Sequence, residues 1–194
     1  MTVDEHLVEI SWREHRILVD LAYAGAGNLA LRPIYGNAAC LVRRETETCL
    51  RRAAYQADLC GLRLKIIDGY RPPEAQAQLW TLVPDKRYLV DPEVGSNHSR
   101  GVAVDLTLVD EDGQDLDMGT KFDTLADASR HRAAGLPPEI HRNRFLLLGI
   151  MRTSGFQEME DEWWHYELPD ARSYPVLQDD RVQCRDLTPR SGKR

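Results

Sequence analysis

Three short segments of the sequence carry side chains that could bind a metal ion or move a proton. One contains His98 and Asp105, a second contains Glu162 and His165, and a third contains Arg71. Two histidines and one carboxylate leave a fourth coordination position for water, which is the composition of a catalytic zinc site rather than of a closed structural one. The spacing therefore predicts a hydrolytic metal centre formed by His98, Asp105 and His165.

Glu162 and His165 can act at one site only if the chain between them bends. In a plain strand, side chains three positions apart point to opposite faces of the sheet, so a bulge is predicted at Trp163 and Trp164. Glu162 would then lie near the metal water as a general base without being a ligand. The spacing alone leaves open the alternative that His165 is a structural histidine.

The elements that must position these residues follow from hydrophobic periodicity. Helices are predicted over 42–60, from Pro72-Pro73 to about 82, and over 139–154. Alternation predicts strands over 62–66, 102–109 and 163–168, with a hairpin turn at 110–113 and a turn-rich segment at 83–97. This order predicts an α+β fold: a single domain with a central antiparallel sheet flanked by helices and the zinc site at the sheet.

Composition limits the partners. The 194 residues carry a formal net charge of −6, and no basic stripe is present, so nucleic acid is not an expected partner. The longest apolar run is far below the roughly 20 residues of a membrane span, and the acidic start Met1–His6 does not resemble an export signal. We expect a cytoplasmic protein with no membrane partner, in one domain over 1–178 followed by a polar tail over 179–194, frayed after Tyr174.

Cysteines and serines offer no competing chemistry. Cys40, Cys49, Cys60 and Cys184 form no Cys-x-x-Cys pair, and Cys49 and Cys60 would lie roughly 16 Å apart on one helix. Free thiols in a reducing compartment are therefore expected. No Gly-x-Ser-x-Gly elbow surrounds a serine, which argues against a serine hydrolase.

Six segments together resemble one known family, in the same order along the chain. They span residues 68–166, with a weaker match at 21–24, and they are 68–72, 98–101, 105–108, 118–123, 154–156 and 162–166. In these segments the sequence resembles the zinc D,D-peptidases of the VanX type, the D-alanyl-D-alanine dipeptidases, whose fold is shared with Hedgehog-like domains. The segment between Trp80 and Ser96 is shorter than in better-known members, which leaves side-chain selectivity open.

The resemblance implies a role for each candidate residue. It implies one Zn²⁺ per chain held by His98, Asp105 and His165, with Glu162 as general base and acid and Arg71 facing the oxyanion. It also implies that the charged ends of a small-molecule substrate, D-Ala-D-Ala, are held by four side chains: Ser96, Asp123, Tyr23 and Tyr35. Without the resemblance, Asp123 would be interpreted as a helix N-cap.

Alternatives remain at this point. A D,D-carboxypeptidase or cell-wall endopeptidase would use similar ligands on longer peptides, and a non-catalytic zinc-binding module is the rival from another class. The presence of Glu162 and Arg71 argues against a non-catalytic module. The sequence leaves open the oligomeric state, and whether D-Ala-D-Ala hydrolysis would serve vancomycin resistance or the recycling of wall fragments.

Overall fold

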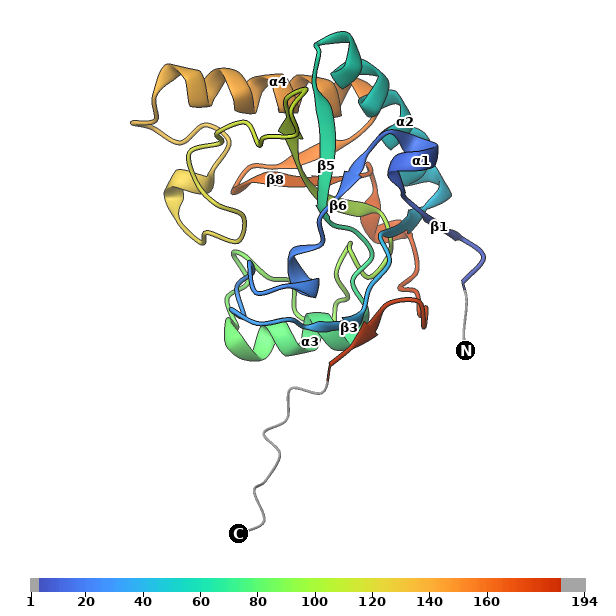
Figure 1. Cartoon of the computed structure of the whole chain (residues 1–194). Helices are drawn as coiled ribbons and strands as arrows, with labels where there is room; N and C mark the ends of the chain where they lie inside the picture. The colour runs from blue at the N-terminus through green and yellow to red at the C-terminus, as the bar shows by residue number, and fades with distance from the viewer. Residues whose placement is uncertain (1–3, 186–194) are drawn as a thin grey trace.

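The computed structural model describes residues 4–185 of the chain (Figure 1). Its α-helices are α1 (Trp12–His15), α2 (Arg44–Leu59), α3 (Pro73–Leu82) and α4 (Pro138–Ser154), and short 3-10 turns cover Ala22–Ala24, Asp127–Ser129 and Ala171–Ser173. The strands are β1 (Leu7–Glu9), β2 (Leu18–Val19), β3 (Tyr35–Asn37), β4 (Leu41–Arg43), β5 (Arg63–Asp68), β6 (Ala103–Val109), β7 (Gln157–Met159), β8 (Glu162–Glu167) and β9 (Gln183–Cys184). The three predicted helices and three predicted strands are confirmed, with ends shifted by one or two residues.

A five-stranded sheet in the order β2-β5-β6-β8-β7 forms the centre of the molecule. Neighbouring strands are antiparallel except β2, which pairs in parallel with β5 at the edge. The α+β prediction of a central antiparallel sheet is confirmed, and the parallel edge strand is an addition to it. Two further pairs, β1 with β4 and β3 with β9, lie outside this sheet.

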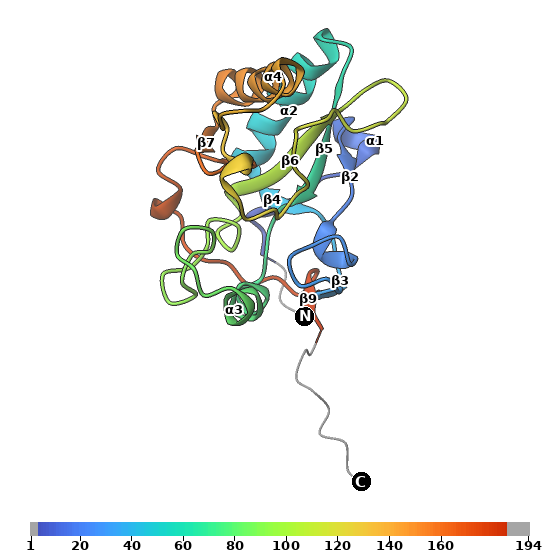
Figure 2. The same cartoon turned by 90° about the vertical axis from the view of Figure 1, so that its left-hand side faces the viewer.

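Alternation along β6 divides the two faces of the sheet. Val104, Leu106 and Leu108 are buried in the main core, together with apolar side chains of α2 and α4 such as Leu50 and Leu147. Both helices lie on that side of β5 and β6 (Figure 2). The side chains of alternate residues point to the opposite face, which leaves that face of β6 available for a site.

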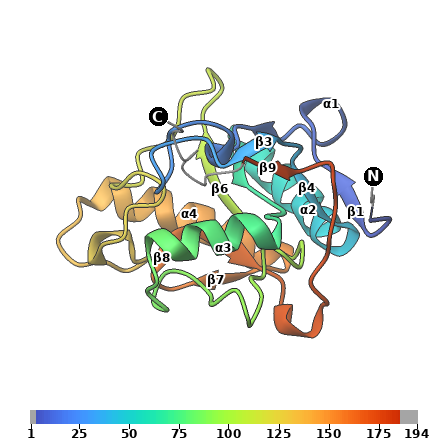
Figure 3. The same cartoon turned by 90° about the horizontal axis from the view of Figure 1, so that it is seen from below.

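A second apolar cluster lies on the side of α3. It joins Leu79 of α3 to Tyr23 and Tyr35 of the N-terminal part, to Tyr70, and to Leu177 and Val182 near the C-terminal end of the described chain. Figure 1 shows α4 above the sheet and α3 below it, and the view from below places β3 and β9 near α3 (Figure 3). The helices therefore flank the sheet as predicted.

The expectation of a frayed tail after Tyr174 is wrong for the part that the structure describes. Leu177 and Val182 are buried in the second cluster, and β9 pairs with β3. Asp179 is buried, and its Oδ2 accepts a hydrogen bond from the backbone N–H of Asp4. Packing thus continues across the expected domain boundary at 178, and residues 186–194 of the predicted tail lie outside the described part.

Two other sequence predictions concern thiols and membranes. All four cysteines are free, as expected. Among residues 4–185, no helix combines the length and the apolar character that a membrane crossing requires.

Candidate active site

Three side chains converge on the face of the sheet opposite α2 and α4. β6 carries Asp105, β8 carries His165, and these two residues are direct partners in the antiparallel register. His98 lies in the turn that leads into β6. His165 Nδ1 is 3.1 Å from Asp105 Oδ1, and His98 Nε2 is 3.2 Å from His165 Nδ1 and 3.4 Å from Asp105 Oδ1. This buried group can hold a metal ion.

In each histidine, one ring nitrogen has a hydrogen-bond acceptor outside the group of three side chains. This leaves the other ring nitrogen of each histidine free to bind a metal ion. His98 Nδ1 lies 2.9 Å from the carbonyl oxygen of Gly69, which can only accept, so Nδ1 carries the proton and Nε2 keeps its lone pair. His165 Nε2 donates in the same way to Glu167, 3.2 Å away. Asn97 in turn donates to the same Glu167 oxygen at 2.7 Å. These outer partners orient both rings for a metal ion.

Asp105 is suited to act as the anionic member of this group. Burial would raise the pKa of Asp105, but the adjacent His98 and His165 rings outweigh burial and hold the pKa below its ordinary value. The carboxylate is therefore ionised at neutral pH, which is the form that binds metals.

Glu162 reaches the same cavity because the strand is bulged. The β7–β8 register passes from Glu158↔Tyr166 directly to Met159↔Glu162, so the bend predicted at the two tryptophans is present. Glu162 and His165 both line a cavity of about 270 Å³. Burial raises the pKa of the Glu162 carboxyl to about 8, and no side-chain hydrogen bond or ion pair satisfies it within residues 4–185. A buried, unpaired carboxyl in a cavity is a candidate general base.

The Arg71 guanidinium is held from three sides. Its Nε donates to Asp68 at 3.0 Å, and one terminal nitrogen donates to Gln76 Oε1 at 2.9 Å. The Tyr23 ring lies 4.8 Å below the guanidinium carbon. The other terminal nitrogen lies 3.6 Å from Asp105 Oδ2, which places the positive charge beside the metal-binding group.

Asp123 lines the same cavity. Its φ of 58° is in the left-handed region, and no helix follows it, so the N-cap alternative is excluded by the described residues. Asp123 Oδ2 accepts from the Leu29 backbone N–H at 2.9 Å, and Oδ1 accepts from the Tyr23 hydroxyl at 3.2 Å. Burial raises the pKa of Asp123 to about 6.

The structure brings nearly all of the predicted site residues together. The cavity is lined by Tyr23, Arg71, Ser96, His98, Asp105, Asp123, Glu162 and His165. Tyr35 differs, because it does not line the cavity and its hydroxyl donates to Asp68 Oδ1 at 2.9 Å. In the structure, Tyr35 contacts Asp68, the partner of Arg71, and its predicted contact with a dipeptide stays a prediction.

Sequence reasoning missed the residues that support the site. Glu167 is two residues beyond His165 on one strand, so period-two alternation could have placed both on the same face. Asp68 closes a buried strand three residues before Arg71, and a carboxylate at such a position needs a partner. No sequence pattern identifies Gln76 as a supporting residue. Its amide nitrogen donates to the carbonyl oxygen of Val90, which lies in an irregular segment.

Comparisons with known proteins agree with this site. Residues 5–185 match the Peptidase M15 family, described as D-ala-D-ala dipeptidase. The chain is 49% identical over 161 residues to a D-alanyl-D-alanine dipeptidase of Escherichia coli (strain K12), covering 83% of each chain. It is 32% identical over 194 residues to one of Enterococcus faecalis (strain ATCC 700802 / V583), covering 89% of this chain and 92% of the relative. A matched span of 5–185 and two relatives covered over most of their length establish that this chain belongs to the Peptidase M15 family of metallopeptidases, the D-ala-D-ala dipeptidases.

Proposed function

We propose that this protein is a zinc dipeptidase that hydrolyses D-Ala-D-Ala. The observation that carries the proposal is the convergence of three metal-binding side chains with Glu162 and Arg71 in one small cavity. The relatives named above are D-alanyl-D-alanine dipeptidases, which supports the same substrate here.

The donor set fits zinc. Donor atoms at about 2.0–2.2 Å from a tetrahedral zinc ion would be about 3.3–3.6 Å apart. The three donor atoms are separated by 3.1–3.4 Å, so small side-chain adjustments would fit them to the ion. Two imidazoles and one carboxylate are ligands that zinc accepts, and three protein ligands leave a position for water. Held by His98, Asp105 and His165, zinc would lower the pKa of a water in that position to about 7 and would polarise the scissile carbonyl.

Glu162 and Arg71 supply the remaining chemistry. Glu162 takes a proton from the attacking water and passes it to the leaving amine, a role that its unpaired carboxyl in the cavity suits. Arg71 faces the negative charge that develops on the carbonyl oxygen. Such a fixed donor contributes roughly 3–4 kcal/mol to transition-state stabilisation, and Asp68, Gln76 and Tyr23 keep the guanidinium in place.

The ends of the dipeptide determine substrate length. We assign the substrate ammonium to Asp123, and the carboxylate end to the neighbourhood of Ser96, whose hydroxyl accepts from the His98 N–H at 3.2 Å. An ammonium buried without a counter-charge costs several kcal/mol. A cavity of about 270 Å³ in which the Asp123 carboxylate meets that ammonium therefore favours a free N-terminus.

We also place this activity in a reducing compartment, the cytoplasm, because four cysteines remain as free thiols. Removal of D-Ala-D-Ala there would act on the supply of a cell-wall dipeptide, which serves either vancomycin resistance or the recycling of wall fragments.

The experiment that tests the proposed function measures amine release by the zinc-loaded protein. We expect hydrolysis of D-Ala-D-Ala, none of L-Ala-L-Ala, and a kcat/KM on N-acetyl-D-Ala-D-Ala at least about a hundredfold lower, which corresponds to roughly 2.7 kcal/mol. Equal kcat/KM on the free and acetylated substrates would favour a D,D-carboxypeptidase. No hydrolysis of any D,D-peptide would overturn the proposal.

A further inference from the structure

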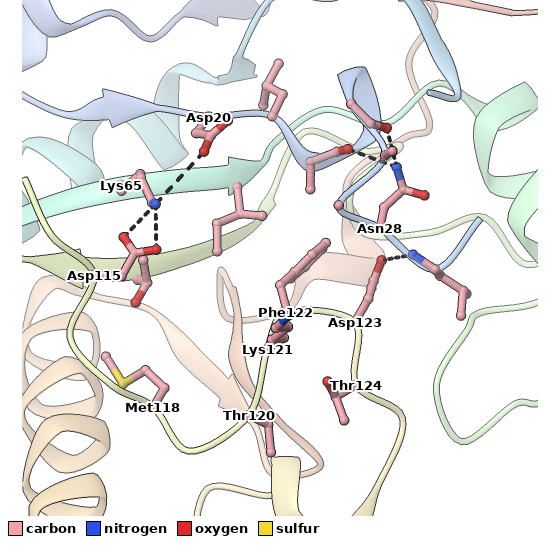
Figure 4. Close-up of a pocket in the computed structure, with 18 of the residues that line it drawn as sticks. Asp20, Asn28, Lys65, Asp115, Met118, Thr120, Lys121, Phe122, Asp123 and Thr124 are labelled. Atoms are coloured by element: carbon pink, nitrogen blue, oxygen red, sulfur yellow. Dashed lines mark hydrogen bonds and ion pairs between the residues drawn. The ribbon is translucent and has the colours of Figure 1, made fainter. Parts of the chain in front are cut away.

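A second, larger hollow adjoins the candidate active site. It is a groove of about 1340 Å³ between the loop 20–31, the segment 115–124 and the sheet. Figure 4 shows Lys65 with its ion-pair partners Asp20 and Asp115 at one end, Asp123 at the other, and Phe122 between them. None of the catalytic roles proposed above uses this groove.

The groove and the active site share one face of β6. Thr107 lines the groove and Asp105 lines the active site. Residues two apart on a strand point to the same face and are about 7 Å apart. The groove therefore begins about 7 Å from Asp105, on the same face of the sheet.

Two residues, Leu29 and Asp123, line both spaces. The Leu29 backbone N–H donates to Asp123 Oδ2 at 2.9 Å, which joins two segments far apart in the sequence at the boundary between the two spaces. Below this contact the wall is aromatic: Phe122 packs edge-on against Tyr23 and Trp164, with ring centroids 5.9 and 5.5 Å apart. Leu29 and Asp123 are therefore the residues at which the two spaces adjoin.

The groove has the chemistry of a peptide site. Apolar side chains such as Ile67 and Met118 line it beside charged groups at its end. The Thr107 hydroxyl is buried and has no hydrogen-bond partner in the described part of the chain. That oxygen is also shielded from solvent, so the resemblance to a peptide site rests on the mixed apolar and charged lining of the groove.

We infer that the groove is the space for residues N-terminal to D-Ala-D-Ala, and that the Leu29–Asp123 contact excludes them. Asp123 then has two separable effects on specificity: its charge binds the ammonium of the dipeptide, and its bulk closes the passage to the groove. This inference rests on the proposed function and names what limits its substrate to two residues.

Two substitutions of Asp123 separate charge from bulk. Asp123→Asn keeps the shape and removes the charge, and asparagine tolerates the φ of 58°. Asp123→Gly removes both and is conformationally favourable at that φ. We expect both variants to lose at least about a hundredfold in kcat/KM on D-Ala-D-Ala, which is the cost of an unpaired ammonium. Only Asp123→Gly should gain on N-acetyl-D-Ala-D-Ala and Gly-D-Ala-D-Ala, by about tenfold or more over wild type, the effect of opening space in a pocket.

Leu29→Ala tests the same partition without touching the charge. It should also raise kcat/KM on the two extended substrates, and it keeps the test decisive if Asp123→Gly does not fold. A gain in Asp123→Asn equal to that in Asp123→Gly would show that charge alone excludes extended peptides. A lack of gain in both Asp123→Gly and Leu29→Ala would overturn the inference. Wild-type activity on D-Ala-D-Ala is measured in the same assay. If wild type hydrolyses D-Ala-D-Ala, the proposed function holds, and the variants then test only the inference about the groove.

Discussion

Replacing Glu162 with glutamine should abolish turnover and leave the metal in place. The three donor atoms lie on other side chains, so Glu162→Gln removes a proton acceptor and no ligand. A general base contributes about 10²–10⁴-fold to the rate, equivalent to roughly 3–5 kcal/mol of activation free energy. We expect kcat to fall within that range while KM changes little.

The same substitution should stabilise the metal-free protein, because wild type buries an unpaired carboxyl. Burial raises the folded-state pKa of Glu162 from 4.5 to about 8. The folded state therefore holds the proton more tightly than the unfolded state, and wild type loses stability as pH rises from 4.5 to 8. The loss is about 1.4 kcal/mol per pH unit, or up to about 5 kcal/mol in total at pH 8. Glutamine does not titrate, so its variant lacks this loss.

The assay pairs zinc content and kcat of the loaded proteins with thermal melting of the chelated proteins at pH 5.5, 7 and 8.5. The Tm advantage of Glu162→Gln should grow with pH, at roughly 2–4 °C per kcal/mol for a chain of this size. Zinc content that falls together with kcat would make Glu162 a ligand. A Tm difference that does not change with pH would refute the argument from burial.

Three further predictions concern the groups around Glu162. Arg71→Ala should lower kcat about 10²–10³-fold with a smaller effect on KM; a raised KM with normal kcat would instead make Arg71 a carboxylate clamp. Gln76→Met should lower kcat about tenfold in wild type but not in the Arg71→Ala background, because Gln76 acts by holding Arg71 and coupled residues are non-additive. An equal loss of kcat in both backgrounds would show that Gln76 acts independently of Arg71. Burial raises the pKa of Asp123 to about 6, so the ratio of kcat/KM for D-Ala-D-Ala to that for its N-acetyl form should fall about tenfold per unit below pH 6, and a constant ratio would contradict the ammonium assignment.

Periodicity and resemblance located most of the site in advance because its residues lie on or beside strongly patterned elements. β6 alternates cleanly, so the face that carries Asp105 could be assigned from the sequence. The bulge at Trp163 and Trp164 was predictable by requiring Glu162 and His165 to act together, and the register confirms it.

What could not be predicted depends on contacts between distant segments. Val182 stands among polar residues, and its burial arises from packing near α3 and the β3–β9 pair, which no local pattern encodes. Tyr35 was assigned to substrate by resemblance, yet its hydroxyl is committed to Asp68. The groove behind Asp123 is formed by segments that lie far apart in the sequence, so only the folded chain reveals it.

Zinc titration of the chelated protein tests the central claim most directly. The protein is stripped of metal, zinc is added in steps, and hydrolysis of D-Ala-D-Ala is followed together with bound zinc. The His98–Asp105–His165 site predicts activity that rises in proportion to bound zinc and reaches a plateau at one equivalent per chain. Full activity in the metal-free protein would contradict this account. So would an inactive protein that has bound one equivalent of zinc per chain.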